Sequence, residues 1–173
     1  NALLAVSLAV AKAEAYSKKQ ELYQHLGKKF LLPKPLMNII NGGAHADNNL
    51  RIQEFMIRPD SAKNFMDAIE KCFLVIQNLK KILLSKKLST NVGDEGGFAP
   101  SINSNEQALN LLVDAIEKSK LKPGKDINIC LDVAANELIN KSGDYSLNSS
   151  KFISVEESIN YYKNLVSKFP IQS

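Results

Sequence analysis

The chain has 173 residues, of which 45% are hydrophobic and 23% charged, and its net charge is +4. This balance is enough to bury the core of about one domain, and it argues against disordered and fibrous classes. The lysines are spread along the chain with acids between them, and the sequence has neither a basic patch interleaved with aromatic residues nor zinc-finger spacing. Solvated helix faces therefore explain the charge better than nucleic-acid binding does.

The first segment, Ala2–Ala15, is rich in alanine and leucine. It imitates the core of a signal peptide, but no basic residue precedes it and a lysine interrupts it. It is also too short to span a bilayer. We predict a packed helix that continues to about Leu26 and ends at Gly27, followed by a linker over Lys28–Pro35. The apolar start without an initiator Met leads us to expect that the sequence is part of a longer protein.

A short buried strand is predicted over Leu36–Ile40, and it runs directly into the glycine turn Asn41–Asp47. His45 lies in this turn, after the end of the strand. Open α/β folds and barrels place their chemistry at such strand ends. A lone histidine in a loop also commonly has a structural role, so both interpretations stay open.

A second strand, Ile52–Ile57, carries Gln53 and Glu54 inside an apolar run. A buried glutamate must be paired, protonated or bound to a cation, which makes Glu54 a candidate site residue. In a regular strand the two neighbours face opposite sides. Both can serve one site only where the strand ends or is irregular.

The segment Asn91–Pro100 places the adjacent acids Asp94 and Glu95 among three glycines. Glycine adopts backbone angles that other residues avoid and lets a ligand approach the main chain, while Pro100 restricts the residue before it to extended conformations. Taken alone, the segment fits a solvated turn equally well. In the company of His45 and Glu54, we predict a shaped loop that displays acids.

Three further helices are predicted from their caps and apolar stripes. The first begins at Ser61 and runs to about Ser85, the second opens at the capping box Ser104–Gln107, and the third opens at the capping box Ser154–Glu157 and ends before Pro170. The residues predicted to face inward are, helix by helix, Phe65, Ile69, Cys72, Ile76, Leu79 and Leu83; Ala108, Leu111, Leu112, Ala115 and Ile116; and Ile159, Tyr162, Val166 and Phe169.

A third strand is predicted over Ile127–Ala134, with Asp132 near its end. This acid suits a metal ligand or catalytic group, or a helix cap. A hairpin is predicted around Ser142–Asp144, and Ile171–Ser173 has the pattern of the start of another strand. Cys72 and Cys130 lie in apolar surroundings, which favours buried, reduced thiols over a disulfide or a metal pair.

The alternating strands and helices, with acids and a histidine at strand ends, predict part of an α/β barrel with a metal–carboxylate site at one rim. Oxygen ligands indicate a hard cation such as magnesium, because the sequence lacks the clusters of Cys and His that suit zinc.

The sequence also resembles a known family, enolase, and most of all its bacterial members. The matching segments, in chain order, are Asn41–His45, Gln53–Met56, Asn91–Pro100 and Leu131–Ala135. The resemblance extends over essentially the whole chain. It implies that residues 1–28 are the last helix of an N-terminal capping domain and that residues 29–173 open an enolase-type TIM-like barrel, truncated at the start of its fourth strand.

The resemblance implies the reversible dehydration of 2-phosphoglycerate to phosphoenolpyruvate in glycolysis, a lyase reaction that depends on Mg2+ to stabilise a dianion. Glu95 matches the general acid/base that protonates the leaving hydroxyl. Asp132 matches the first carboxylate ligand of the magnesium ion that binds the substrate carboxylate. His45, Gln53 and Glu54 match residues that line the substrate pocket, and Glu54 is expected to share the proton network of Glu95.

In the family, a lysine base, two further acidic metal ligands and the phosphate-holding groups lie beyond the last residue of this chain. We therefore expect the isolated chain to be inactive. The alternative is a non-catalytic enolase remnant, either inert or acting as an interaction protein. Arg51 and Asn136 depart from the family pattern, and Arg51 adds a charge near the acids.

The family also implies a homodimer or higher homo-oligomer in the cytoplasm. By analogy it allows display at the cell surface or secretion. We expect neither nucleic-acid binding nor a membrane span.

Overall fold

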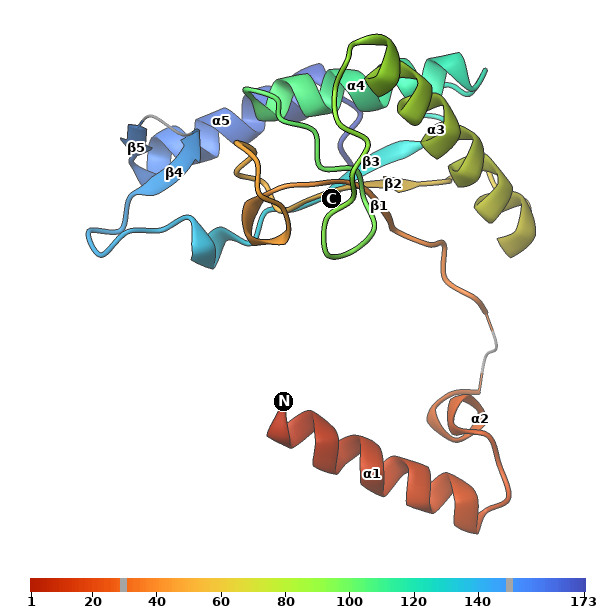
Figure 1. The fold of residues 1–173 in the computed structure, drawn as a ribbon. Helices are drawn as coiled ribbons and strands as arrows, with labels where there is room; N and C mark the ends of the chain where they lie inside the picture. The colour runs from red at the N-terminus through yellow and green to blue at the C-terminus, as the bar shows by residue number, and fades with distance from the viewer. Residues whose placement is uncertain (29–30, 149–150) are drawn as a thin grey trace. The chain divides into compact units, whose positions relative to one another are not determined.

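The computed structural model describes residues 1–28, 31–148 and 151–173. The chain forms two compact units, Asn1–Pro33 and Lys34–Ser173 (Figure 1). None of the helices in the described ranges is long and apolar enough to cross a membrane.

The first unit contains two helices, α1 (Ala2–Ser17) and α2 (Leu22–Leu26), so the prediction of one continuous helix to Leu26 is wrong. The break has a local cause. Lys19 adopts a left-handed conformation with φ 53°, and the next amide, that of Gln20, donates back to the carbonyl of Ala15 at 3.0 Å. These bonds close α1, and a capping box between Glu21 and Gln24 starts α2. Gly27 ends α2 as predicted.

The second unit is built on a three-stranded sheet in the order β1-β2-β3, formed by β1 (Met37–Asn41), β2 (Glu54–Arg58) and β3 (Asn128–Asp132). Both pairings are antiparallel. As predicted, the segment from Ile171 onward extends the sheet, because Gln172 donates to the carbonyl of Ile129 at 2.9 Å and pairs it parallel with β3. The result is the mixed α/β pattern of an incomplete barrel.

A β-bulge interrupts the pairing of β1 with β2. Asn38 lies opposite Met56 and Ile40 opposite Phe55, so Ile39 is an extra residue in β1. Because side chains alternate along a strand, residues three positions apart normally face opposite sides. The bulge instead places Asn38 and Asn41 on the same face of the sheet.

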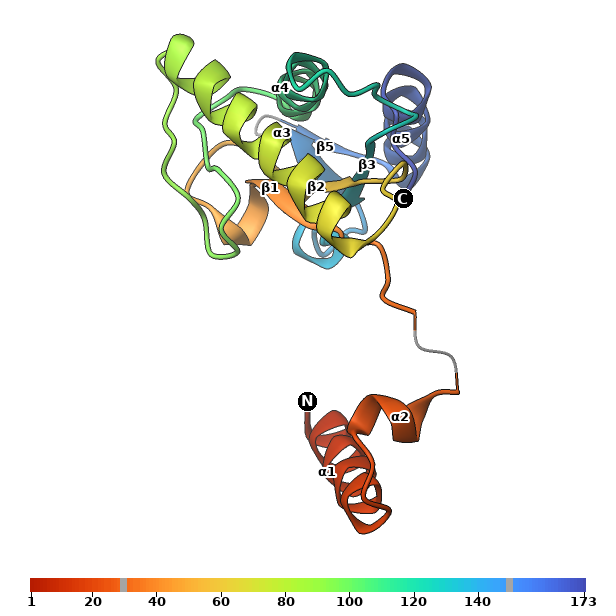
Figure 2. The same ribbon diagram turned by 90° about the vertical axis from the view of Figure 1, so that its right-hand side faces the viewer.

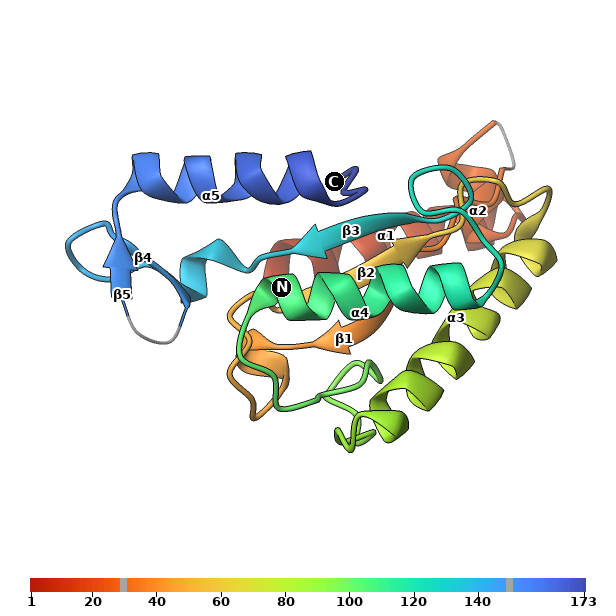
Figure 3. The ribbon, with the colours of Figure 1, turned by 90° about the horizontal axis from the view of Figure 1, so that it is seen from above.

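Three helices, α3 (Phe65–Ser85), α4 (Asn105–Lys118) and α5 (Val155–Lys168), lie on the same side of the sheet (Figures 1 and 2). Their inner residues and the apolar face of the sheet form one core. Figure 3 shows these helices and the sheet from above. The largest side chains at its centre include Phe55, Leu79 and Leu112. All five inward-facing residues predicted for α4 are buried.

Two of the predicted helix faces are partly wrong. In α3, Cys72, Leu79 and Leu83 are buried as predicted, whereas Phe65 is 45% exposed at the first residue of the helix. In α5, Ile159 and Val166 are half exposed, and the helix buries Leu165 and Ser158 instead. The inward face of α5 is therefore rotated from the predicted one.

The caps of the helices are mostly those predicted. Ser154 and Glu157 form both bonds of a capping box, and Ser104 accepts a hydrogen bond from the Gln107 amide. The side chain of Gln107 bonds the amide of Asn103 instead of that of Ser104. The prediction of Ser61 as the cap of α3 is wrong, because Asn64 accepts from the amide of Asp67 at 2.9 Å and starts the helix there.

After β3 come the short 3-10 helix η2 (Ala135–Glu137) and a small hairpin of β4 (Tyr145–Asn148) and β5 (Lys151–Ile153). Around the hairpin predicted at Ser142–Asp144, the chain reverses with an antiparallel bridge between Ile139 and Tyr145 and a backbone bond from Ser146 to Leu138 at 2.9 Å, but the segment before the turn is not a regular strand. The regular hairpin follows it in the chain, and residues 149–150 lie outside the described ranges. Both cysteines are free and buried, as predicted.

Candidate active site

One edge of the sheet brings three polar side chains into a row. Asn41 ends β1, Glu54 begins β2 and Asp132 ends β3, and the register places Glu54 opposite both of the others. Residues opposite each other on neighbouring strands point to the same face, with Cβ atoms about 5 Å apart. This edge thus gathers the acids of two strands that are 78 positions apart in the chain, as 132 − 54 shows.

The acidic loop that carries Glu95 is fastened to the same edge. Phe98 donates to the carbonyl of Ile39 at 2.8 Å, and Asn41 donates to the carbonyl of Phe98 at 2.9 Å. The loop continues the hydrogen bonding of β1 on the side away from β2.

Two glycines allow this close approach. A Cβ on Gly97 would overlap the Oδ1 atom of Asn41, and one on Gly93 would overlap the carbonyl oxygen of His45. Of the three glycines in the acidic loop, only Gly96, with φ 82°, needs glycine's left-handed backbone. From the sequence we predicted this backbone freedom for all three. At Gly93 and Gly97 the reason is instead that a side chain would not fit.

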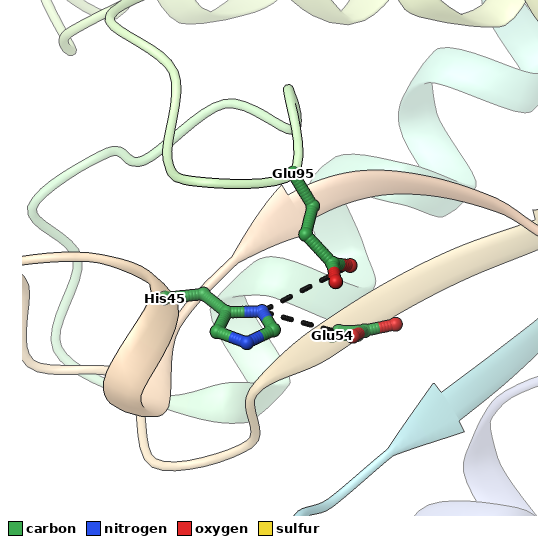
Figure 4. A group of neighbouring side chains, drawn as sticks. All are labelled: His45, Glu54 and Glu95. Carbon is green, nitrogen blue, oxygen red and sulfur yellow. Dashed lines mark ion pairs between the residues drawn. The ribbon is translucent and has the colours of Figure 1, made fainter. Parts of the chain in front are cut away.

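His45 comes from the 3-10 helix η1 (Gly43–His45), which turns the chain back toward the sheet edge. Its Nδ1 atom lies 3.7 Å from Oε1 of Glu54 and 3.9 Å from Oε2 of Glu95 (Figure 4). The three residues offer ligand atoms that all lie within 4.8 Å of one another. The structure thus brings His45 and the acidic loop together in one cluster with Glu54.

The pKa values of the two glutamates in the cluster are shifted in opposite directions. Burial, a hydrogen bond with Glu95 and the charges of Glu95 and Asp132 raise the pKa of Glu54 to about 7. The hydrogen bonds from Glu54 and Asn38 lower the pKa of Glu95. Of the two carboxyl groups, Glu54 therefore takes up a proton more readily than Glu95, because two close carboxylates do not both ionise readily. Such a pair can accept or release a proton at neutral pH.

Asp132 lies beside this cluster but is not one of its three members. Its side chain is exposed, and Oδ1 accepts a hydrogen bond from the amide of Ala134 at 2.9 Å. The N-cap of η2 is Ala134, without a side-chain cap, so the alternative of a helix-capping role is wrong for Asp132. An exposed carboxylate at a strand end fits a hard cation by its donor chemistry.

Gln53 lies just before β2, where its carbonyl accepts a hydrogen bond from Gly42 at 2.9 Å. The strand begins at Glu54, as required for neighbours that serve one site, but Gln53 does not belong to the three-residue cluster. Arg51 lines a separate cleft of about 460 Å³ with Glu137 and Lys151.

Sequence analysis missed two asparagines at the site, Asn38 and Asn41. The amide of Asn38 bonds Glu95, and Asn41 is fully buried among the glycines of the acidic loop. Both are polar residues in a short apolar strand, the same signal that singled out Glu54.

A cleft of about 460 Å³ lies beside the cluster, lined by residues of the η1 turn and the acidic loop, including His45, Asp47, Asn91 and Asp94. Small molecules can therefore approach the histidine side of the cluster from solvent.

The incomplete barrel defines an α/β-barrel protein that carries a cluster of a histidine and two glutamates at one edge of its sheet. The family model described as "Enolase, C-terminal TIM barrel domain" matches residues 29–173. A curated protein named "Enolase", from Pelagibacter ubique (strain HTCC1062), is 60% identical over 175 residues, a stretch that covers 100% of this chain and 42% of that protein. The chain belongs to the enolase family, and it spans less than half the length of this relative.

Proposed function

We propose that this chain supplies the acid–base end of an enolase active site, in a protein that converts 2-phosphoglycerate to phosphoenolpyruvate and back. The observation that carries the proposal is the cluster in which the carboxylates of Glu54 and Glu95 both lie within 4 Å of His45. Family membership supports the same reaction.

The reaction needs two separate proton transfers, one from carbon 2 and one to the hydroxyl on carbon 3. Carbon 2 loses a proton to a base, the electron pair left behind forms the double bond to carbon 3, and the hydroxyl on carbon 3 leaves as water after taking a proton. We assign the last transfer to Glu95, with Glu54 holding the proton that Glu95 delivers. General acid–base catalysis of this kind contributes roughly 10²–10⁴-fold in rate.

We assign His45, Gln53 and Glu54 to the substrate pocket and Asp132 to the metal. The family uses metal ions, and we propose magnesium, because Asp132 is a carboxylate and oxygen ligands suit a hard cation. When bound, Mg2+ stabilises the negative charge that develops on the substrate carboxylate. The cluster of His45, Glu54 and Glu95 is better suited to moving a proton, because binding a cation there would require Glu54 to give up its proton.

The rest of the enzyme is proposed from the family. The base and the phosphate-binding groups come from the part of the protein outside these 173 residues, since the chain covers 42% of the curated relative. We propose that residues 1–28 belong to a capping domain and that the complete protein is a homo-oligomer. Two free, buried cysteines support a cytoplasmic location.

The test is an activity assay on a chimera in which residues 1–173 replace the matching stretch of the Pelagibacter ubique enolase. We expect the chimera to form phosphoenolpyruvate in the presence of magnesium. Glu95→Gln should lower kcat by roughly 10²–10⁴-fold, whereas the exposed Glu70→Gln on α3 should leave it unchanged. The 173-residue chain alone should show no turnover. An inactive chimera that folds would favour the non-catalytic remnant.

A further inference from the structure

Asn38 lies on β1 next to the buried Ile39, on the same face of the sheet as the acids. The register places it opposite Met56, two residues along β2 from Glu54. Without the extra residue at Ile39, Asn38 and Asn41 would face opposite sides. The bulge thus re-aims a polar side chain into the site.

The amide of Asn38 contacts the one member of the cluster that stands on a loop. Its Nδ2 atom donates to Oε2 of Glu95 at 3.3 Å. Its Oδ1 atom is buried and has no hydrogen-bond partner in the described part of the chain. In the described part of the chain, the bond to Glu95 is therefore the side-chain hydrogen bond that Asn38 makes.

Glu95 needs such a contact. Its side chain is 46% exposed, and a free glutamate side chain samples many rotamers. The backbone bonds between Phe98 and β1 fix the loop beside Asn38, so the donor and the carboxylate are held on the same piece of sheet. A rigid donor restricts the carboxylate to the position where it also meets Glu54 and His45.

We propose that Asn38 is a positioning residue that holds the carboxylate of Glu95 beside Glu54 and His45. Its importance for turnover rests on the function proposed above. Asn38 would not touch the reacting atoms; it would act through Glu95 by limiting where the carboxylate can lie. Its loss should therefore lower kcat while substrate affinity changes little.

The test compares three substitutions at one position in the chimera. Asn38→Ala removes the donor, and we expect kcat to fall about ten-fold, the size of effect expected for a hydrogen bond to a charged group, with KM changed less than about two-fold. Asn38→Gln keeps an amide donor and should recover part of the loss. Asn38→Asp keeps the shape but replaces the donor with a second negative charge, so it should be the least active. Asn78→Ala on α3, which removes an asparagine outside the site, is the control and should match the parent protein.

A crystal structure of the Asn38→Ala chimera provides a readout that does not depend on activity. We expect the Glu95 carboxylate to leave its place beside His45 or to occupy several rotamers. If the parent chimera is inactive but Glu95 is displaced, the positioning role stands and the proposed function fails. The positioning role is overturned if Asn38→Ala keeps both the carboxylate position and kcat, or if Asn38→Asp is as active as the parent.

Discussion

Glu54 and Glu95 are chemically identical residues that the fold makes different. Glu54 begins a strand and its side chain is 13% exposed, whereas Glu95 stands on a loop and is 46% exposed. Desolvation raises the pKa of the buried member, whereas hydrogen bonds lower the pKa of the exposed one. The Nδ1 atom of His45 lies within 4 Å of both carboxylates.

The raised pKa of Glu54 makes a prediction for stability. With a folded-state pKa of about 7 against an ordinary value of 4.5, the folded protein binds more protons than the unfolded one between these pH values. This contribution to stability is present below about pH 4.5 and is lost as pH rises to about 7, on the order of 3 kcal/mol in total. Urea unfolding of the chimera at several pH values measures it.

Glu54→Gln is the matched variant, because glutamine resembles the protonated form at every pH. We expect the variant to lose the decline in stability between pH 4.5 and 7, relative to the parent. An identical pH dependence in both proteins would show that Glu54 ionises normally.

At the scale of elements, the acidic loop depends on glycines that let it lie against β1. Gly97→Ala places a methyl group onto the amide of Asn41 and the backbone of Ile39, so we expect a loss of about 1–3 kcal/mol in stability, together with reduced activity. Gly143→Ala is the control. Gly143 differs in having a positive φ and open space around it, so its substitution should lower stability by about 1 kcal/mol and leave activity intact. Equal activity in the two variants would contradict the proposed docking of the loop.

The start of α3 tests the corrected cap. Asn64→Ala should destabilise the chimera by about 1 kcal/mol, because the amide of Asp67 loses its acceptor. Ser61→Ala should have less than half of that effect, since Ser61 is exposed and precedes the helix. Thermal or urea unfolding of the two variants decides between them, and a larger effect at Ser61 would restore the first assignment.

Elements whose signals are local were predictable from the sequence. The capping box at Ser154 and the stripe of α4 depend on residues three or four positions apart, and both are confirmed. The choice between Ser61 and Asn64 was not predictable, because both are good caps and the tertiary path of the chain decides. The bulge at Ile39 had no signal in the strand itself, since it arises from the pairing of β1 with β2 and with Phe98.

The candidate site was predictable as a list but not as a geometry. Motif resemblance indicated His45, Glu54, Glu95 and Asp132. The register brings Glu54 and Asp132 to one edge, and the η1 turn and the acidic loop bring His45 and Glu95 to Glu54. Which of the two glutamates has the raised pKa depends on burial, and burial cannot be read from the sequence. Asn38 escaped notice because its role depends on a bulge.

At the scale of the whole molecule, the first unit leaves apolar surface uncovered. Leu3, Leu4 and Val6 of α1 are each more than 60% exposed. We expect the 173-residue chain, expressed alone, to bind ANS, and to lose this signal when the remaining part of the relative is supplied in trans. Weak ANS fluorescence from the chain alone would show that it covers this surface by itself.

The central claim is that Glu95 acts on the leaving hydroxyl and not on the proton of carbon 2. The direct measurement follows exchange of that proton with deuterated solvent by NMR, using the Glu95→Gln chimera, 2-phosphoglycerate and magnesium. The account predicts that exchange continues while formation of phosphoenolpyruvate is lost, because the base lies elsewhere in the protein. Loss of exchange in parallel with dehydration, in a variant that still folds and binds substrate, would contradict it.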